Sequence, residues 1–90
     1  MEEVTPREVC LKSALSAVKV RPDNYGDPKT NFQDIARLWN SVQHASVYEP
    51  ENVALFMILV KVARLMHDPS HEDSWIDIAG YAACGYEVTQ

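Results

Sequence analysis

Apolar residues recur along most of this chain at the three- and four-residue spacing of amphipathic helices. The first predicted helix covers residues 6–20, because Thr5 can serve as its N-cap and Pro6 fits the first helical position. Residues 21–30 contain two prolines and one glycine and therefore predict a turn. No segment shows the sustained alternation that is typical of a strand.

The second predicted helix carries its apolar residues on one face and ends near Val42. Asp27 is a suitable N-cap, and Pro28 then occupies the first helical position. Thr30 offers an alternative start two residues later. Residues 43–49 show no strong periodicity and predict a connecting loop.

The third predicted helix, residues 50–67, contains the longest apolar run. From Val53 to Met66 only Lys61 and Arg64 are polar, and such a helix is typically enclosed by its neighbours. We therefore expect it to be the central, buried helix. Its apolar run of about 14 residues is shorter than the roughly 20 residues of a membrane span, so no membrane partner is expected.

A fourth helix is predicted from about residue 71 to residue 83, after the helix-breaking Asp68-Pro69-Ser70 turn. Ser70 is the expected N-cap. Gly80 permits close approach to a neighbouring helix, whereas Gly85 is expected to end the helix and leave the last five residues frayed.

These elements predict an all-α fold, a single domain of residues 1–90 built as a bundle of about four helices. The sequence does not fix how the first and fourth helices are placed. A chain of 90 residues buries only about 60–65% of its unfolded surface, and a second subunit can cover an apolar helix that one chain cannot. We therefore expect a homo-oligomer.

The net charge of -5 and the scattered basic residues argue against duplex DNA as a partner, but two or three cations can still hold a small anion. Cys10 and Cys84 do not form a disulfide framework, and we expect both to be reduced. The first residues show no basic region followed by an apolar stretch, so a cytoplasmic protein is expected.

Candidate chemistry lies on the third and fourth predicted helices. Lys61 and Arg64 share one helical face, as do Asp73 and Asp77, and the short turn can bring these two faces together. Two interpretations remain open. The four charges form a mutually satisfied network, or they border a pocket in which the cations bind phosphate and the aspartates bind a metal ion or a ribose hydroxyl.

Two further features are less specific. Tyr25, beside a glycine, can pack against the fold or stack on a base. His67 and His71 are separated by the helix-breaking turn, so their spacing does not favour a zinc site, and no metal-binding residues are assigned.

Several motifs together resemble a family of small bacteriophage proteins of unknown function. The resemblance covers roughly residues 20–86 and is carried by the segments Tyr25-Gly26-Asp27-Pro28, Asn31-Phe32, Val53-Ala54-Leu55, Lys61-Val62-Ala63-Arg64-Leu65 and Asp73-Ser74-Trp75-Ile76-Asp77-Ile78-Ala79-Gly80-Tyr81-Ala82-Ala83. More distantly, the order of these motifs is similar to phage domains associated with nucleotide modification and to the all-α, MazG-like nucleotide pyrophosphohydrolases.

The resemblance implies a phage-encoded protein in the host cytoplasm that binds a nucleotide or a nucleotide-derived signal and sequesters it from host defence. In that role Lys61 and Arg64 would hold phosphate, Tyr25 would stack on the base, and Asp73 or Asp77 would accept from ribose. MazG-like enzymes bind magnesium through a Glu-x-x-Glu and a Glu-x-x-Asp motif, which this chain lacks. We therefore favour a binder without a cofactor over an enzyme.

Two alternatives remain. The first is a magnesium-dependent pyrophosphohydrolase in which Asp73 and Asp77, with Glu49 or Glu51, bind the metal ion. The second is a module that binds and inhibits a host protein through an exposed helix face, using Trp39 or Trp75.

Overall fold

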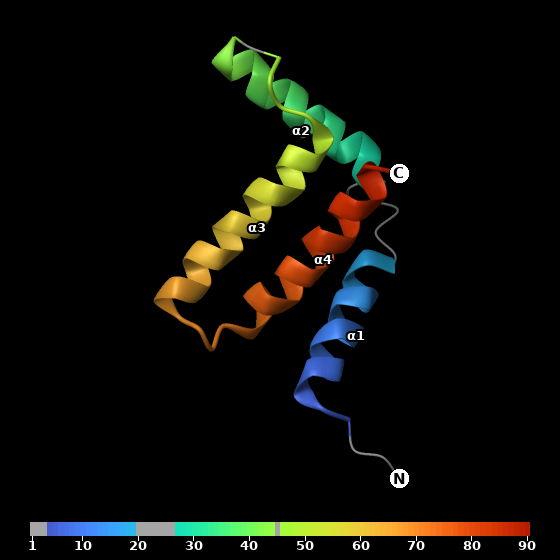
Figure 1. The fold of residues 1–90 in the computed structure, drawn as a ribbon, viewed down its shortest axis with the longest axis vertical. Coiled ribbons are helices and arrows are strands. Elements are labelled where there is room, and N and C mark those ends of the chain that lie inside the picture. The colour runs from blue at the N-terminus through green and yellow to red at the C-terminus, as the bar shows by residue number, and fades with distance from the viewer. Residues whose placement is uncertain (1–3, 20–26, 45) are drawn as a thin grey trace.

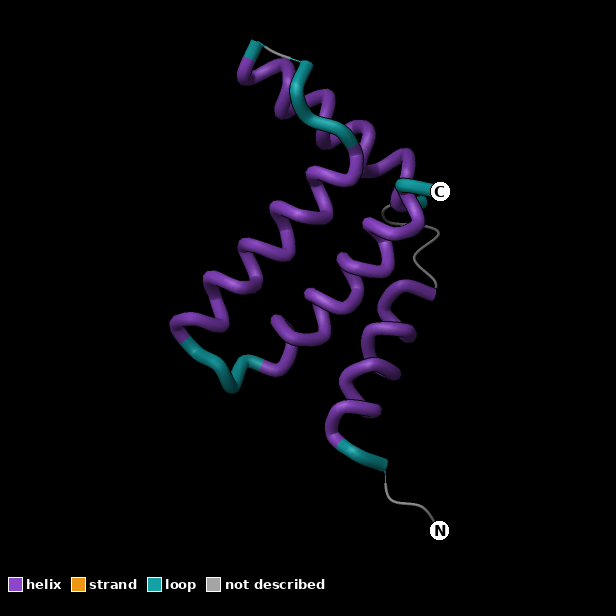
Figure 2. The backbone as a smooth tube through the Cα atoms, in the orientation of Figure 1, coloured by secondary structure: helices purple, strands orange, loops and turns teal. Residues whose placement is uncertain are grey.

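The computed structural model describes residues 4–19, 27–44 and 46–90. Four helices make up most of these residues: α1 (Pro6–Lys19), α2 (Pro28–Gln43), α3 (Pro50–His67) and α4 (Glu72–Val88). The described ranges contain no strand (Figure 2). The all-α prediction of four helices is therefore confirmed.

The helices form a layer of three with the fourth lying across one end (Figure 1). α3 and α4 are an antiparallel pair, and α1 lies along the other side of α4. α2 crosses the place where α3 begins and α4 ends. Among the described helices, α4 packs against the other three, whereas α1 packs against α4 alone.

The prediction that residues 50–67 form the central, enclosed helix is wrong, because α4 holds the middle position. Small residues on α4 explain the difference, since they allow a helix to approach on each side. A Cβ atom added at Gly80 would lie 3.7 Å from Val18 of α1, and one added at Gly85 would lie 3.0 Å from the Cβ of Ala54 on α3. α3 is left at the edge of the layer, with one apolar face uncovered.

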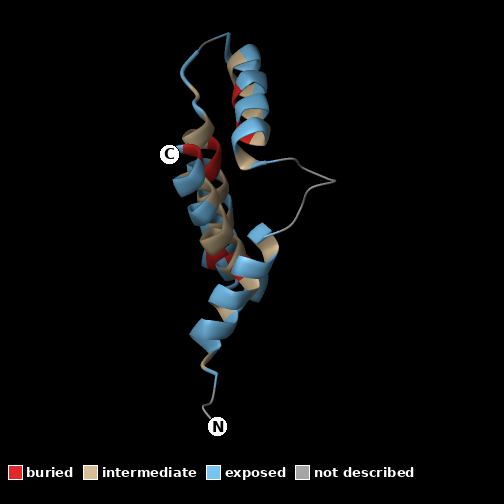
Figure 3. Cartoon of the chain, turned by 90° about the vertical axis from the view of Figure 1, so that its right-hand side faces the viewer, coloured by how far each residue is buried: buried red, intermediate tan, exposed pale blue. Residues whose placement is uncertain are grey.

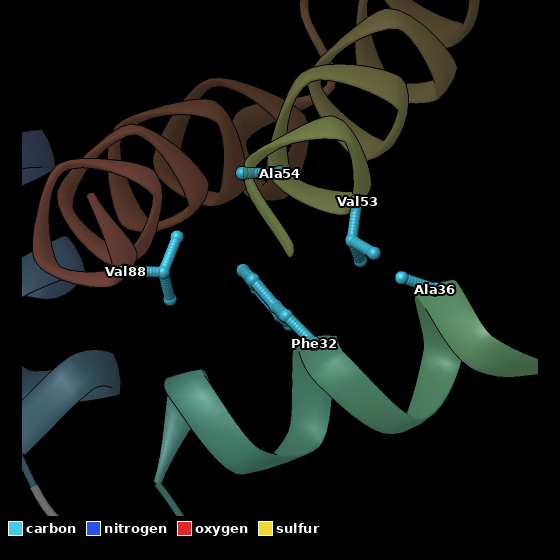
Figure 4. Packing of buried hydrophobic residues seen from close by; sticks show 5 residues of the cluster. All are labelled: Phe32, Ala36, Val53, Ala54 and Val88. Atoms are coloured by element: carbon cyan, nitrogen blue, oxygen red, sulfur yellow. The ribbon is translucent and has the colours of Figure 1, made fainter. Parts of the chain in front are cut away.

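The buried core lies where α2 meets the ends of α3 and α4. Figure 4 shows Phe32 pointing from α2 into the space between Val88 of α4 and Val53 of α3, and the core is completed by Ala36 and Ala54. Figure 3 shows that buried positions are few and that α1 is exposed along most of its length.

The predicted end of the fourth helix is also wrong. α4 continues through Gly85 to Val88, which is only 9% exposed and belongs to the core. The glycine serves the close approach of α4 to Ala54 and does not terminate the helix. Packing of Val88 against α2 and α3 keeps the last turn helical.

Side-chain hydrogen bonds of the N-cap residues mark where α1 and α2 begin. Thr5 Oγ1 accepts from the backbone N–H of Glu8 at 3.3 Å, as predicted for the start of α1. Asp27 caps α2: its carboxylate accepts from the backbone N–H of Thr30 at 2.9 Å and from the Thr30 hydroxyl at 3.1 Å. These two hydrogen bonds lower the pKa of the Asp27 carboxyl. The start at Pro28 is thereby confirmed.

The predicted cap of the fourth helix is corrected. Ser70 does not cap α4. Its backbone N–H and its hydroxyl both donate to Asp68 Oδ1, the residue two positions earlier, at 3.1 and 2.7 Å. His71 takes the N-cap position instead. Its Nδ1 lies 2.8 Å from the hydroxyl oxygen of Ser74, which is fully buried.

The molecule is flat and elongated, with extents of 55 × 31 × 22 Å. Its radius of gyration of 14.8 Å exceeds the roughly 12 Å of a compact domain of this length. The accessible surface is 6885 Å², about 1,600 Å² more than compact monomers of this mass expose. A single layer of helices therefore leaves much apolar surface in contact with solvent.

Candidate functional site

An open groove of about 640 Å³ lies among the described helices, and all four of them contribute to its lining. Its walls are mostly apolar and include Val18 of α1, Phe32 and Ile35 of α2, Val53 and Met57 of α3, and Ile76 of α4. Three side chains offer hydrogen-bonding groups: Asn31 from α2, and Asp77 and Tyr81 from α4. The groove thus combines apolar walls with a few polar groups, which is typical of small-molecule sites.

An ion pair stands at the edge of this groove. Lys61 Nζ of α3 lies 3.0 Å from Asp77 Oδ2 of α4, and the side chains are 15% and 40% exposed. The short turn between the two helices therefore does bring a cation and a carboxylate together, as predicted. Asp77 also lines the groove, so this pair links the fold to the candidate site.

The other predicted site residues lie elsewhere. Arg64 and Asp73 are both exposed, and neither lines the groove. Arg64 lies seven residues beyond the groove residue Met57, which is about 10 Å farther along α3. Asp73 lies one turn before Asp77, close to the start of α4. Tyr25 lies outside the described residues.

Three groove residues with polar groups were not among the predicted site residues, namely Asn31, Tyr81 and Cys84. A signal for Cys84 was present, because Asp77, Tyr81 and Cys84 follow each other at four- and three-residue steps and so share one face of α4. Burial, followed by the negative charge of Glu87, raises the pKa of the Cys84 thiol. It therefore stays protonated at neutral pH and is a poor nucleophile. Cys10 and Cys84 are both free, as expected.

Acidic side chains do not gather as a metal site would require. Among the described residues, no three His, Cys, Asp or Glu side chains are grouped so that they could share a metal ion. Glu49 and Glu51 precede Lys61 by 12 and 10 residues, a distance of roughly 15–18 Å along a helix, so they do not converge on Asp77. Within the same ranges, no helix is long and apolar enough to cross a membrane.

Two ion pairs among the described residues allow a matched test. Asp77→Asn is expected to lower the free energy of unfolding by about 1–2 kcal/mol, because the largely buried ammonium of Lys61 loses its carboxylate. Adding Lys61→Met should recover most of that loss, since methionine keeps the volume and removes the charge. Urea denaturation with a constant m-value measures both changes.

The control is the exposed pair of Asp34 and Arg37, whose atoms lie 3.4 Å apart and whose side chains are 61% and 75% exposed. Asp34→Asn should change the free energy of unfolding by no more than about 0.5 kcal/mol. Equal effects of the two substitutions would show that the ion pair beside the groove contributes nothing beyond an ordinary surface contact.

Comparison with known proteins places the chain in a family. A family model described as "Domain of unknown function (DUF6378)" matches residues 9–89. The chain is 47% identical over 62 residues to the Gene 55 protein of Mycobacterium phage L5, a match that covers 69% of this chain and 40% of that protein. It is 44% identical over 64 residues to the Gene 55 protein of Mycobacterium phage D29, covering 71% and 42%.

The chain thus spans about 40% of the length of both relatives. No solved structure matches it. The predicted resemblance to a phage protein family of unknown function is confirmed, because the family model covers nearly the whole chain and both relatives are phage proteins. The chain belongs to the DUF6378 family.

Proposed function

We propose that this protein binds a nucleotide-type small molecule in the groove and releases it chemically unchanged. The observation that carries the proposal is the groove itself, where Asn31, Asp77 and Tyr81 lie among apolar walls with Lys61 paired to Asp77 at the edge. Its volume of about 640 Å³ falls within the roughly 300–1,000 Å³ of small-molecule sites. In a phage-encoded protein, such binding would sequester a nucleotide signal of the host.

Each polar group has a role in this proposal. Apolar walls accept the faces of a base, and Tyr81 adds an aromatic ring. Asp77 accepts a hydrogen bond from a ribose hydroxyl or an exocyclic amine, and the amide of Asn31 can donate as well as accept. Lys61 lies at the edge of the groove through its contact with Asp77 and is the candidate partner of a phosphate. Tyr25 remains a predicted stacking residue. Arg64 and Asp73 are exposed and do not line the groove, so they are not part of the proposed site.

The proposed ligand can be identified by incubating the purified protein with a panel of nucleotides and cyclic nucleotides, with and without magnesium. Free ligand is measured by chromatography before and after heat denaturation. Depletion of one ligand, followed by its intact recovery on heating, is the expected result. Asp77→Asn should raise the dissociation constant about tenfold through the loss of a hydrogen bond to a charged acceptor.

Asp73→Asn is the matched control, because it makes the same chemical change on the same helix outside the groove, and it should leave binding unchanged. A new product peak that requires magnesium would support the hydrolase alternative instead. If no ligand is depleted, the groove does not serve nucleotides.

A second candidate function, binding to another protein, is favoured by the exposed apolar residues. Leu59, Met66 and Trp75 are 60%, 82% and 52% exposed. Trp39, by contrast, is partly buried and packs in an aromatic cluster, with its ring centroid 5.6 Å from that of Tyr48 and 5.5 Å from that of Phe56. Of the two tryptophans predicted to meet a partner, Trp75 is therefore the available one.

A further inference from the structure

The groove follows the seam between α3 and α4. At one end of this seam, Lys61 of α3 pairs with Asp77 of α4 at 3.0 Å. At the other end, Ala54 of α3 lies against Gly85 of α4. The groove is lined along the seam by Val53 and Met57 of α3 and by Asp77, Tyr81 and Cys84 of α4. A ligand in the groove therefore lies lengthwise along the two helices.

The two ends of the groove differ in chemistry. At one end α2 crosses the seam (Figure 1), where Phe32 contributes an apolar ring and Asn31 contributes an amide. The other end carries the carboxylate of Asp77, with the ammonium of Lys61 beside it at the edge. About eight residues of α3 lie between the two ends, a distance of roughly 12 Å. The groove thus has an apolar end and a charged end.

The charges favour the Lys61 end as the place of a phosphate group. The first turn of α2 lies at the apolar end, and the N-terminus of a helix commonly attracts an anion. Here the carboxylate of Asp27 already occupies that position, because it accepts from the backbone N–H and the hydroxyl of Thr30 at 2.9 and 3.1 Å. The Lys61 ammonium has three N–H groups, and its contact with Asp77 uses one of them. The apolar end is then left for the base.

We propose that the groove selects ribonucleotides, with the base hydrogen-bonded to Asn31 at the α2 end and a ribose hydroxyl donating to Asp77. This inference rests on the proposed function and narrows its ligand class. Asp77 lines the groove and Lys61 stands at its edge, in the order in which ribose and phosphate follow the base of a nucleotide. An ionised carboxylate can only accept, as a sugar hydroxyl requires, whereas an amide donates and accepts, as the edge of a base requires.

Calorimetric titration of the full chain tests the role of Asp77. The probes are the four ribonucleoside 5′-monophosphates and their 2′-deoxy and 3′-deoxy analogues. Removing the hydroxyl that Asp77 accepts should raise the dissociation constant about tenfold, because a hydrogen bond to a charged acceptor is lost. In Asp77→Asn that ratio should fall to about threefold, since the acceptor is then neutral. The ratio compares two ligands on one variant, so a loss of stability does not change it.

Asn31→Leu is the matched variant at the other end, because it removes the amide and keeps a similar side-chain size. It should alter the preference among the four bases and leave the ratio between ribonucleotide and deoxy analogue unchanged. Asp77→Asn should leave the base preference unchanged. Circular dichroism verifies that both variants stay helical. The reverse pattern, in which base preference follows Asp77 and the hydroxyl ratio follows Asn31, would overturn the proposed orientation.

Equal affinity for a ribonucleotide and both of its deoxy analogues would overturn this inference and leave nucleotide binding in place. Failure of all four ribonucleoside monophosphates to bind would overturn it as well. The proposed function fails only if the wider panel of nucleotides and cyclic nucleotides is also left undepleted, so the two failures are distinguished.

Discussion

Phe32→Ala should lower the free energy of unfolding by about 3–5 kcal/mol, the usual range for removing a buried phenylalanine. Phe32 is 5% exposed and is the largest side chain of the core cluster, which otherwise consists of two alanines and two valines. Small neighbours on three different helices cannot fill the space that its ring leaves. Since domains of this size are stable by about 5–13 kcal/mol, the variant should lose a large share of its stability.

Thermal and urea denaturation, followed by circular dichroism, measure this loss. Leu38→Ala is the control on the same helix, because Leu38 is 66% exposed, and its effect should stay within about 0.5 kcal/mol. Similar losses in both variants would mean that the cluster around Phe32 is not the core of the fold.

Gly85→Ala and Gly80→Ala should change stability in opposite directions. Alanine is favoured over glycine inside a helix by about 0.5–1 kcal/mol, and Gly80→Ala should gain that amount, because its new methyl group meets Val18 at an ordinary 3.7 Å. At Gly85 the methyl group would lie 3.0 Å from the Cβ of Ala54. Ala54 is 2% exposed and its Cβ is fixed to the backbone, so α3 and α4 must move apart. The resulting overpacking should cost about 1–3 kcal/mol.

A double-mutant cycle isolates the contact. Ala54→Gly alone should destabilise the protein, because it places a glycine inside α3 and removes a buried methyl group. Combined with Gly85→Ala, it restores the space between the helices, so the double variant should be more stable than the sum of the two single effects predicts. Strict additivity would show that the α3–α4 distance is not set by this pair.

Local chemistry explains which parts of the fold could be predicted from the sequence. The start of α2 follows from Asp27 and Pro28, whose capping geometry is complete within four residues. Pairing of Lys61 with Asp77 could also be predicted, because a turn of four residues leaves two adjacent helices little choice but to pack antiparallel. In each case the interacting groups are close in sequence or joined by a short connection.

The wrong predictions concern features that depend on contacts between residues far apart in the sequence. An all-round apolar α3 is compatible with a central position or with an edge position beside another subunit, and the sequence of α3 alone does not distinguish the two. A glycine is typical of the position that ends a helix. Gly85 instead allows α4 to approach Ala54 closely, and Ala54 lies about 30 residues earlier in the sequence. The spacing of Lys61 and Arg64 puts both on one side of α3. The position of α4 decides that Lys61, and not Arg64, contacts Asp77.

The attachment of α1 has a consequence for the order in which the molecule assembles. α1 packs against α4 alone among the described helices, and more than 50 residues separate the two elements. Closing so long a loop is costly in entropy, whereas the α3–α4 hairpin needs only a short one. We therefore expect α1 to dock after the α3–α4 hairpin has formed and to detach before that hairpin opens. Because Ala17 and Val18 form one wall of the groove, its docking completes the site, and a molecule held there would in turn retain α1.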